Sequence, residues 1–437
     1  MENKSPKKSF HHYLYFLLGQ QFSMLGSMIV GFVITWWMAD NVIFLSLSVF
    51  LMFLPQILVT PFSGVIADRW NKKIIIAISD SMQAALTFLL FVFFLLDIQN
   101  IGFILTINTF RAASFAFQYP TVSSLVATMI PKDKLSRING LNFLSAGLIY
   151  STGPMIAAFL MALIPQTELI FLIDIITFLI AMVPLVIIKI PKVNQTTVEA
   201  TKKSMFKDFK TGLITIKMIP GLFAMIAFAM IWNFIHRPWA VLFPNFIKET
   251  HGGTALNLAL LTTSSQVGNI VGSLITTYKK TWKHKIKLNI IGAAITFICQ
   301  IPAILAPQGN FILMIIALFP AWVLFPITVS TYLAILQTVV SKDKQGRIMS
   351  IDHMISMLIA PIGALIAGPL ALLMGIRTLF LIMAILGILH PFGIWFFTKI
   401  RQLEVIEREI MAKGELEKVA EEVKEEEEVV QITEIIE

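Results

Sequence analysis

The sequence predicts an all-α membrane protein with twelve transmembrane helices in two six-helix bundles. Of its 437 residues 57% are hydrophobic and only 14% are charged, which is more apolar surface than a soluble domain can bury. Apolar runs of about 18 residues or more recur along the chain, and each is long enough to cross a membrane. The charged loop from Pro131 to Ile138 returns 210 residues later, from Ser341 to Ile348, again followed by an apolar run. That duplication predicts two related halves.

The apolar runs place the twelve spans, with short polar breaks between them. The first six are expected at roughly 13–38, 42–66, 74–96, 101–127, 137–163 and 168–188. The second six are expected at roughly 219–247, 254–278, 288–306, 310–338, 349–374 and 377–398. The first run is too long for a signal-peptide core and lacks a small-residue cleavage pattern, so we expect it to remain as a span.

These spans divide the chain into five parts. The last part, the tail from residue 399 onward, holds 13 of the 26 acidic residues, and we expect it to be solvated and partly helical. The five parts are a polar arm at 1–12, the N-terminal bundle at 13–188, a Lys- and Thr-rich linker at 189–218, the C-terminal bundle at 219–398, and the acidic tail at 399–437.

The basic residues predict the orientation. Thirty of the 34 Lys and Arg residues fall in loops and tails on one side of the predicted membrane, whereas Lys248 and Arg377 fall on the other. Because basic loops stay inside, we expect both termini in the cytoplasm and the protein in the cytoplasmic membrane. The basic residues are spread over six short loops, which suits contact with anionic lipids and argues against a nucleic-acid partner.

The chain lacks the patterns of an enzyme or an ATP-driven pump. It has no phosphate-binding G-x-x-x-x-G-K-[ST] loop, no HExxH or GxSxG motif, and no Cys/His spacing typical of a metal site. We therefore expect no enzymatic activity, no cofactor and no bound metal. Transport would then be energised by an ion gradient, or it would be passive.

The break after the second span carries the first family resemblance. It reads Gly64-Val65-Ile66-Ala67-Asp68-Arg69-Trp70-Asn71-Lys72-Lys73, which resembles the signature loop of the major facilitator superfamily. The resemblance implies the major facilitator fold, a monomer, and a loop that latches the two halves on the inner side. Gly64 would let two helices approach closely and Asp68 would bond a helix N-terminus in the other bundle. The latch residues would be Gly64, Asp68, Arg69, Lys72 and Lys73, and a plain positive-inside charge cluster is the alternative.

The span at 137–163 resembles a pattern of glycines found in drug–proton antiporters of the same superfamily. Gly140, Gly153 and Pro154 match the pattern, whereas its other glycines are replaced here. We expect the small residues to pack this span closely against the facing span of the other bundle, and Pro154 to bend it. Ordinary small-residue packing is the alternative.

Four further matches are GQQFSMLGS at 19–27, GVIADRWNKK at 64–73 followed by Asp80, RAASFAFQYP at 111–120, and Ile173-Asp174. With them the chain resembles the macrolide-efflux branch most closely, over nearly all of residues 13–400. The resemblance implies a proton-coupled exporter of a macrolide or another lipophilic or amphipathic small molecule. Siderophore exporters and lysophospholipid transporters share the branch, so a lipid transporter or flippase, coupled or uncoupled, stays open. A transport-dead membrane sensor or assembly partner that uses the acidic tail also stays open.

Ionisable residues inside spans are costly and mark candidate functional sites. Asp174 and Arg111 lie about 9 Å and about 15 Å into their spans from the outer side at 1.5 Å per residue, so they could pair inside the N-terminal bundle. We expect Asp174 to carry protons and Arg111 to modulate it, with a static ion pair as the alternative. Asp80 is expected to support the signature loop or to take part in coupling. Asp352 is expected to cap a helix start.

Polar and aromatic residues within the spans are the candidates for a substrate cavity. A large apolar cavity with a few amides suits a bulky amphipathic compound. Arg237 is expected to bind an anionic group or to pair with Asp174, with a snorkelling position near the outer interface as the alternative. The candidates are Gln20, Gln21, Trp36, Phe115, Asn142, Trp232, Asn233 and Arg237.

Overall fold

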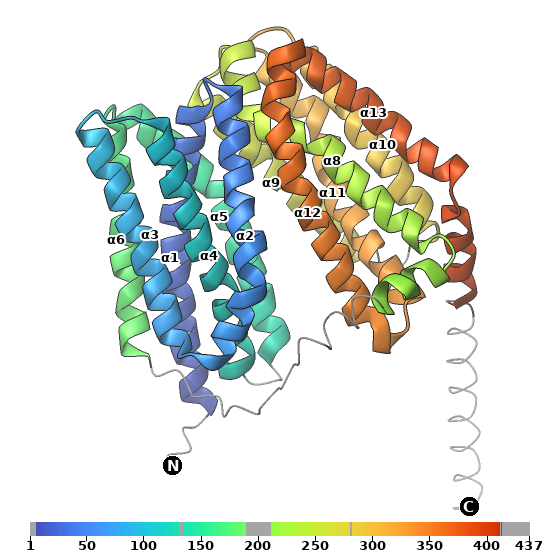
Figure 1. The fold of residues 1–437 in the computed structure, drawn as a ribbon, viewed down its shortest axis with the longest axis horizontal. Coiled ribbons are helices and arrows are strands. Elements are labelled where there is room, and N and C mark those ends of the chain that lie inside the picture. The colour runs from blue at the N-terminus through green and yellow to red at the C-terminus, as the bar shows by residue number, and fades with distance from the viewer. Residues whose placement is uncertain (1–5, 131–133, 189–210, 280–281, 411, 413–437) are drawn as a thin grey trace, which may run out of the picture.

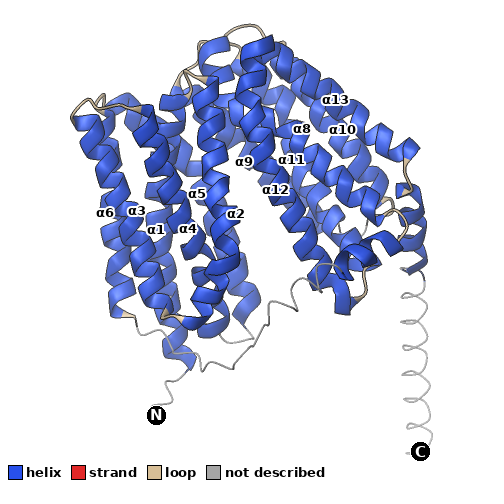
Figure 2. Ribbon diagram, in the orientation of Figure 1, coloured by secondary structure: helices blue, strands red, loops and turns tan. Residues whose placement is uncertain are grey.

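The computed structural model describes residues 6–130, 134–188, 211–279, 282–410 and 412, apart from the side chains of a few helical residues that include Gly64, Asp68 and Arg69. Helices make up almost all of this part of the chain (Figure 2). The N-terminal bundle contains α1 (Pro6–Met38), α2 (Val42–Arg69), α3 (Lys72–Leu95), α4 (Ile101–Met129), α5 (Leu135–Leu163) and α6 (Thr167–Ile187). The C-terminal bundle contains α8 (Leu222–Asn245) with the π-helical turn η2 (Phe246–Thr250), α9 (Ala255–Tyr278), α10 (Lys285–Ile304), α11 (Phe311–Val339), α12 (Lys342–Met374) and α13 (Ile376–Phe397).

The described part of the chain forms twelve long helices, which confirms the predicted all-α membrane fold. Eleven of them are long and apolar enough to cross a membrane, and α4 is the exception because polar residues such as Arg111 and Gln118 interrupt it. Asparagine side chains cap α2, α3, α4 and α11 by accepting hydrogen bonds from first-turn N–H groups. The observed bounds lie close to the expected ones except that α1 and α12 each begin seven residues earlier.

The two bundles repeat one arrangement of helices. In the first, α1 packs on α5 and α6, and α3 packs on α4 and α6; in the second, α8 packs on α12 and α13, and α10 packs on α11 and α13. The bundles meet reciprocally, through α2 against α12 and through α5 against α9. Gly153 of α5 faces Met28 of α1, and Gly363 of α12, 210 residues later, faces Arg237 of α8. The duplicated loops therefore mark two structurally equivalent halves.

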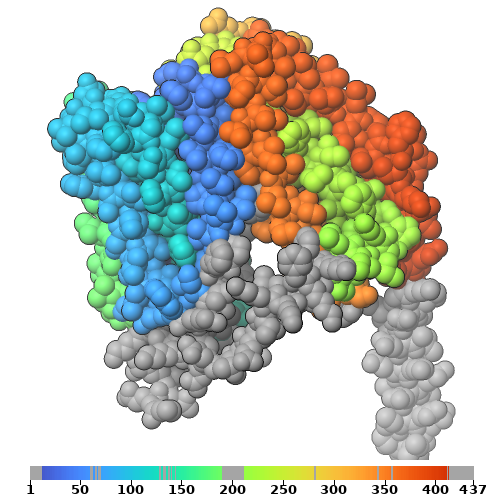
Figure 3. Space-filling view, viewed as in Figure 1, coloured from blue at the N-terminus to red at the C-terminus, as the bar shows by residue number. Residues whose placement is uncertain are grey.

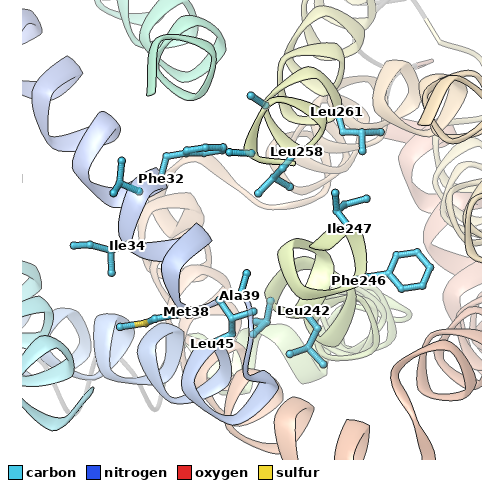
Figure 4. Packing of buried hydrophobic residues seen from close by; sticks show 14 of the residues in the cluster. Phe32, Ile34, Met38, Ala39, Leu45, Leu242, Phe246, Ile247, Leu258 and Leu261 are labelled. Carbon is cyan, nitrogen blue, oxygen red and sulfur yellow. The ribbon is translucent and has the colours of Figure 1, made fainter. Parts of the chain in front are cut away.

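The bundles converge at one end of the molecule and diverge at the other, where α1 begins and α13 finishes (Figures 1 and 3). We call the diverging end the termini side and the converging end the far side. On the far side, buried apolar residues of both bundles form one cluster (Figure 4). The members that Figure 4 labels come from α1, α2, α8, η2 and α9, and they include Phe32, Met38, Leu45, Leu242, Phe246, Ile247 and Leu258. This close packing shuts the space between the bundles on the far side.

Residues 400–410 form a helix that packs on the C-terminal bundle, so the expectation of a solvated tail from residue 399 is wrong for this part. Ile400 and Leu403 belong to a buried apolar cluster with residues of α8, α10, α11 and α12. Glu407 Oε1 lies 2.6 Å from Lys285 Nζ, and the two side chains are only 5% and 10% exposed. The helix is therefore held by apolar burial and by a buried ion pair.

The predicted linker is also partly helical. Residues 211–218 form a short helix, and Ile216 is buried in the same apolar cluster as Leu403. The rest of the linker, 189–210, and the end of the tail, 413–437, lie outside the described residues.

Glu407→Ala should lower thermal stability because it removes the carboxylate that lies 2.6 Å from the buried Lys285 ammonium group. Removing one member of a buried ion pair costs about 3–5 kcal/mol. The matched control is Glu409→Ala on the exposed face of the same helix, which should leave the unfolding temperature unchanged. Thermal unfolding of the purified protein in detergent measures both effects. Equal unfolding temperatures for the two variants would contradict the docked arrangement.

Candidate functional site

Asp174 lies at the centre of a buried polar cluster within the N-terminal bundle. Its Oδ2 is 3.2 Å from Arg111 Nη2, and the side chains of Asp174 and Arg111 are 4% and 10% exposed. Thr87 Oγ1 lies 2.6 Å from the same oxygen, and Ser27 Oγ donates to Asp174 Oδ1 at 2.9 Å. The four residues come from α6, α4, α3 and α1, so four helices converge on one carboxyl group. The structure thus brings Asp174 and Arg111 together, while their role in coupling stays a prediction.

A row of amide and hydroxyl groups connects this cluster to Asp80, which is also buried. Asp80 accepts hydrogen bonds from Gln20 Nε2 at 3.0 Å and from Gln118 Nε2. Gln83 Nε2 donates to Gln118 Oε1 at 2.8 Å, and Thr87 Oγ1 lies 3.0 Å from the Gln83 carbonyl oxygen. Asp80 and Asp174 are therefore linked through Gln83 and Thr87 of α3, and this link includes the covalent path from the Gln83 backbone carbonyl to its side-chain amide. Among the described side chains, Asp80 contacts these amides and not the signature loop.

The two carboxyl groups of this network have different kinds of partner. Asp174 has a cationic partner, whereas the contacts of Asp80 come from neutral amides. Arg111 Nε is buried with no hydrogen-bond partner among the described residues, so the guanidinium has a donor to spare. The described residues contain no group of three or more His, Cys, Asp or Glu that could hold a metal ion.

Ser27, Gln83, Thr87 and Gln118 complete the network, and sequence reasoning had not singled them out. Two signals could have found them. Ser27 and Gln118 lie within two of the four runs of residues that carry the family resemblance, 19–27 and 111–120. Gln83 and Thr87 follow Asp80 by three and seven residues on α3, which places all three on one helix face.

The C-terminal bundle encloses a cavity of about 260 Å³ among α8, α10, α11 and α12, and two predicted cavity residues, Trp232 and Asn233, line it. Asp352 lines it as well, and its Oδ1 accepts a hydrogen bond from Tyr332 Oη at 2.5 Å. Because α12 begins at Lys342, Asp352 lies ten residues into the helix, and the expectation that it caps the helix start is wrong.

The other predicted cavity residues have separate surroundings. Asn142 Nδ2 donates to Tyr13 Oη at 3.2 Å within the N-terminal bundle. The ring of Phe115 lies 5.9 Å from that of Tyr119, centroid to centroid, on α4. Gln21 Oε1 is buried with no hydrogen-bond partner among the described residues. The structure therefore does not gather the predicted set into one pocket.

Arg237 does not pair with Asp174, whose cationic partner is Arg111. Its guanidinium carbon lies 5.3 Å from the ring centroid of Phe53 on α2, a cation–π contact between the two bundles. Its Nε has no hydrogen-bond partner among the described residues. Arg237 thus lies at the bundle interface, where α8 meets α2 and α12.

The signature loop is tied to the end of α6 by one of its lysines. Lys73 Nζ donates to the carbonyl oxygens of Val186 at 2.6 Å and Ile188 at 3.0 Å. Asn71 caps α3 by accepting a hydrogen bond from the Lys73 N–H group. The side chains of the other predicted latch residues, Gly64, Asp68 and Arg69, lie outside the described residues, and Lys72 begins α3.

The glycines of α5 have different environments. A side chain at Gly153 would meet Met28 of α1 at 3.1 Å, so the expectation that this glycine faces the other bundle is wrong. A side chain at Gly140 would have no neighbour within 4 Å among the described atoms. Pro154 lies inside the helix. α5 as a whole does pack against α9 of the other bundle, as expected, and at this interface Thr263 Oγ1 of α9 donates a hydrogen bond to the Ser151 carbonyl oxygen at 2.9 Å.

Polar contacts reinforce the closure of the far side. Lys248 of η2 makes an ion pair with Asp40, Nζ to Oδ1 at 2.6 Å, and its Nζ lies 5.0 Å from the ring centroid of Trp36. Asn245 Nδ2 donates to the Ala39 carbonyl oxygen at 2.7 Å. Trp36, predicted to line the cavity, therefore belongs to the closed end of the space between the bundles.

Known proteins share this architecture. The family model described as Major Facilitator Superfamily matches residues 16–360 and 238–418. Macrolide efflux protein A of Streptococcus pyogenes is 23% identical over 391 residues, which covers 89% of this chain and 96% of that protein. The protein of the same name from Enterococcus faecalis is 24% identical over 320 residues, 73% of this chain and 98% of that one. The structure of a bacterial homologue of iron transporter ferroportin in inward-facing state has a TM-score of 0.66 at 15% identity, over 88% of this chain and 98% of that chain.

Proposed function

This chain belongs to the Major Facilitator Superfamily and is a multi-pass membrane transporter, and we propose that it exports a lipophilic or amphipathic small molecule in exchange for protons. The similarity to two macrolide efflux proteins over most of the chain supports a macrolide-like or drug-like substrate. The basic loops support a cytoplasmic membrane location with both termini inside. Under that orientation the termini side is the cytoplasmic side.

The observation that best supports proton coupling is the buried ion pair of Asp174 and Arg111, at the point where four helices meet. An ionised carboxyl group at this depth is costly unless it is paired. When a proton neutralises Asp174, Arg111 loses its counter-ion, and the contacts among α1, α3, α4 and α6 must rearrange. Protonation is thereby linked to helix packing. Asp80, joined to the same network, is the second group that can hold a proton.

The structure corresponds to the state that is open to the cytoplasm in this proposal. Asp174 is paired with Arg111, as expected after its proton has left on the cytoplasmic side. Substrate then enters between the diverging bundles. To release it outside, the Lys248–Asp40 contact and the apolar cluster of the far side must separate while the cytoplasmic ends close. The reciprocal interfaces, α2 with α12 and α5 with α9, allow the halves to rock against each other.

The energy available from protons suits export. One proton entering through a membrane potential of 100 mV contributes about 2.3 kcal/mol, which corresponds to roughly a fifty-fold substrate gradient. The proton concentration difference adds to this amount.

Transport by the purified full-length protein in lipid vesicles tests the proposal. A radiolabelled macrolide or a lipophilic dye should accumulate against its gradient when a pH gradient is imposed, and a protonophore should reduce accumulation about tenfold or more. Protein-free vesicles are the control. Equilibration that ignores the gradient, or movement of labelled lysophospholipid in place of these compounds, would contradict proton-coupled drug export and favour the lipid alternative.

A further inference from the structure

We propose that the cavity of the C-terminal bundle is a subsite for the cationic group of the substrate, with Asp352 as its counter-ion and aromatic rings as its walls. This inference rests on the proposed export function and narrows the substrate class to amphipathic organic cations, such as protonated amines. Of the residues that line this subsite, only Trp232 and Asn233 were predicted from the sequence to line a substrate cavity.

The walls of the cavity are rich in aromatic rings. Phe228, Trp232, Phe325 and Tyr332 all line it. Trp232 is stacked on His236, with ring centroids 4.9 Å apart and planes 6° apart, which fixes the orientation of the indole. The centroid of the Phe325 ring lies 6.4 Å from the centroid of the Trp232 ring. Several aromatic faces around one space are the usual means by which proteins bind quaternary ammonium groups and other organic cations.

The charge of the cavity complements a cation. Asp352 is the acidic residue among the described residues that line it, and no Lys or Arg is among them. Lys285, one turn before Asn289 on α10, is paired with Glu407. Tyr332 donates its hydroxyl hydrogen to Asp352 Oδ1, which orients the carboxyl group without neutralising it. A ligand with a positive charge would supply a counter-charge inside the cavity.

Comparison of the two halves shows that this acid is particular to the C-terminal half. Asp352 lies 210 residues after Asn142, at the equivalent position of the repeat. In the N-terminal half the neutral amide of Asn142 is bonded to Tyr13. A helix-packing role shared by the two halves therefore does not require a charge at this position.

The size and position of the cavity suit part of a larger substrate. Its volume of about 260 Å³ is below that of typical drug-sized sites, about 300–1,000 Å³, so it would hold the cationic group and a neighbouring ring. Phe325 and Val329, which line it, are 45% and 41% exposed, so the cavity opens past them. Phe228 lies six residues into α8, about 9 Å from its termini-side start. The subsite is therefore near the side from which substrate is loaded.

Equilibrium binding of radiolabelled tetraphenylphosphonium to the detergent-purified protein tests the subsite, with uncharged triphenylphosphine oxide as the matched neutral probe. Asp352→Asn should weaken binding of the cation about tenfold or more, because the counter-ion in the cavity is lost, and should change binding of the neutral probe less than twofold. Asp352→Glu should recover part of the cation affinity. Asp97→Asn, an exposed carboxyl group in the far-side loop, is the control and should change neither.

Three outcomes would overturn the subsite. They are no cation binding by the wild-type protein, unchanged cation binding by Asp352→Asn, and equal loss of both probes, which would mean a structural role. The assay needs no proton gradient, so its result is independent of coupling. If the cation fails to bind while proton-driven export of a neutral lipophile persists, the subsite is wrong and the proposed function stands. If cation binding depends on Asp352 but no gradient drives transport, the subsite stands and the proposed proton-coupled export is wrong.

Discussion

Asp174→Asn should reduce proton-driven export about tenfold or more. The asparagine keeps the shape of the side chain and a hydrogen-bond acceptor for Ser27, but it cannot take up a proton. Arg111 then stays buried without its anionic partner. A buried cation left in this way destabilises a protein by about 3–5 kcal/mol, so thermal unfolding of the same variant must be recorded beside transport in vesicles.

The double variant Arg111→Gln with Asp174→Asn separates coupling from structure. Neutralising both partners removes the unpaired charge, so the unfolding temperature should return toward that of the wild-type protein. Proton-driven export should remain lost, because no proton carrier has been restored. Recovery of export together with stability would show that the pair is a static structural contact. Asp97→Asn serves here too as the control for a carboxyl group outside the network.

Gly368→Ala should give the second large effect, by opposing closure of the far side. A β-carbon at Gly368 of α12 would lie 2.7 Å from the Val42 carbonyl oxygen and 3.0 Å from the Ile43 Cα of α2. Both neighbours are backbone atoms, which cannot rotate away as a side chain can, so the two helices must move apart. A cost of about 1–2 kcal/mol on one state changes the ratio of the two states about 5–30-fold. We expect export to fall by about fivefold or more, with the far side more often open.

Gly147→Ala on α5 is the matched control, because a β-carbon there would meet no described atom within 4 Å. Closure can be read from the yield of a crosslink that a short bifunctional thiol reagent forms between cysteines introduced at Asp40 and Lys248, whose side chains meet across the two bundles, in a Cys299→Ser background. The yield should fall with Gly368→Ala and stay constant with Gly147→Ala. Equal yields in the two variants would show that close approach at Gly368 does not control closure.

The fold could be predicted because its main determinant is local. Each span is a long apolar run, and the duplicated loops reveal the two halves, so the helix order follows from composition and length. Even α4 could be placed, although Arg111 interrupts its apolar pattern. The helix at 400–410 could not, because its acidic residues appear solvated until Lys285, more than a hundred residues earlier, is placed beside Glu407.

Only the charged residues of the candidate site could be predicted from the sequence. Asp174 and Arg111 stand out because a charged group inside a span requires a counter-charge, and the structure places them in contact. Ser27 and Thr87 do not stand out, since hydroxyl residues are common in membrane helices. Arg237 was assigned possible anionic partners, yet its observed neighbour is the ring of Phe53, which depends on how the two bundles are docked. Such contacts between bundles are set by tertiary packing and leave no periodic signal in the sequence.

The most direct test of the central claim, exchange of substrate for protons through Asp174, is to record the pH inside sealed vesicles while substrate moves. A trapped pH-sensitive dye reports proton movement, and a radiolabelled macrolide reports substrate movement in the same preparation. An imposed substrate gradient should drive protons in the opposite direction with the wild-type protein, and no proton flux above the protein-free level should occur with Asp174→Asn. Substrate movement by the wild-type protein without proton flux, or equal proton flux in both proteins, would contradict the account.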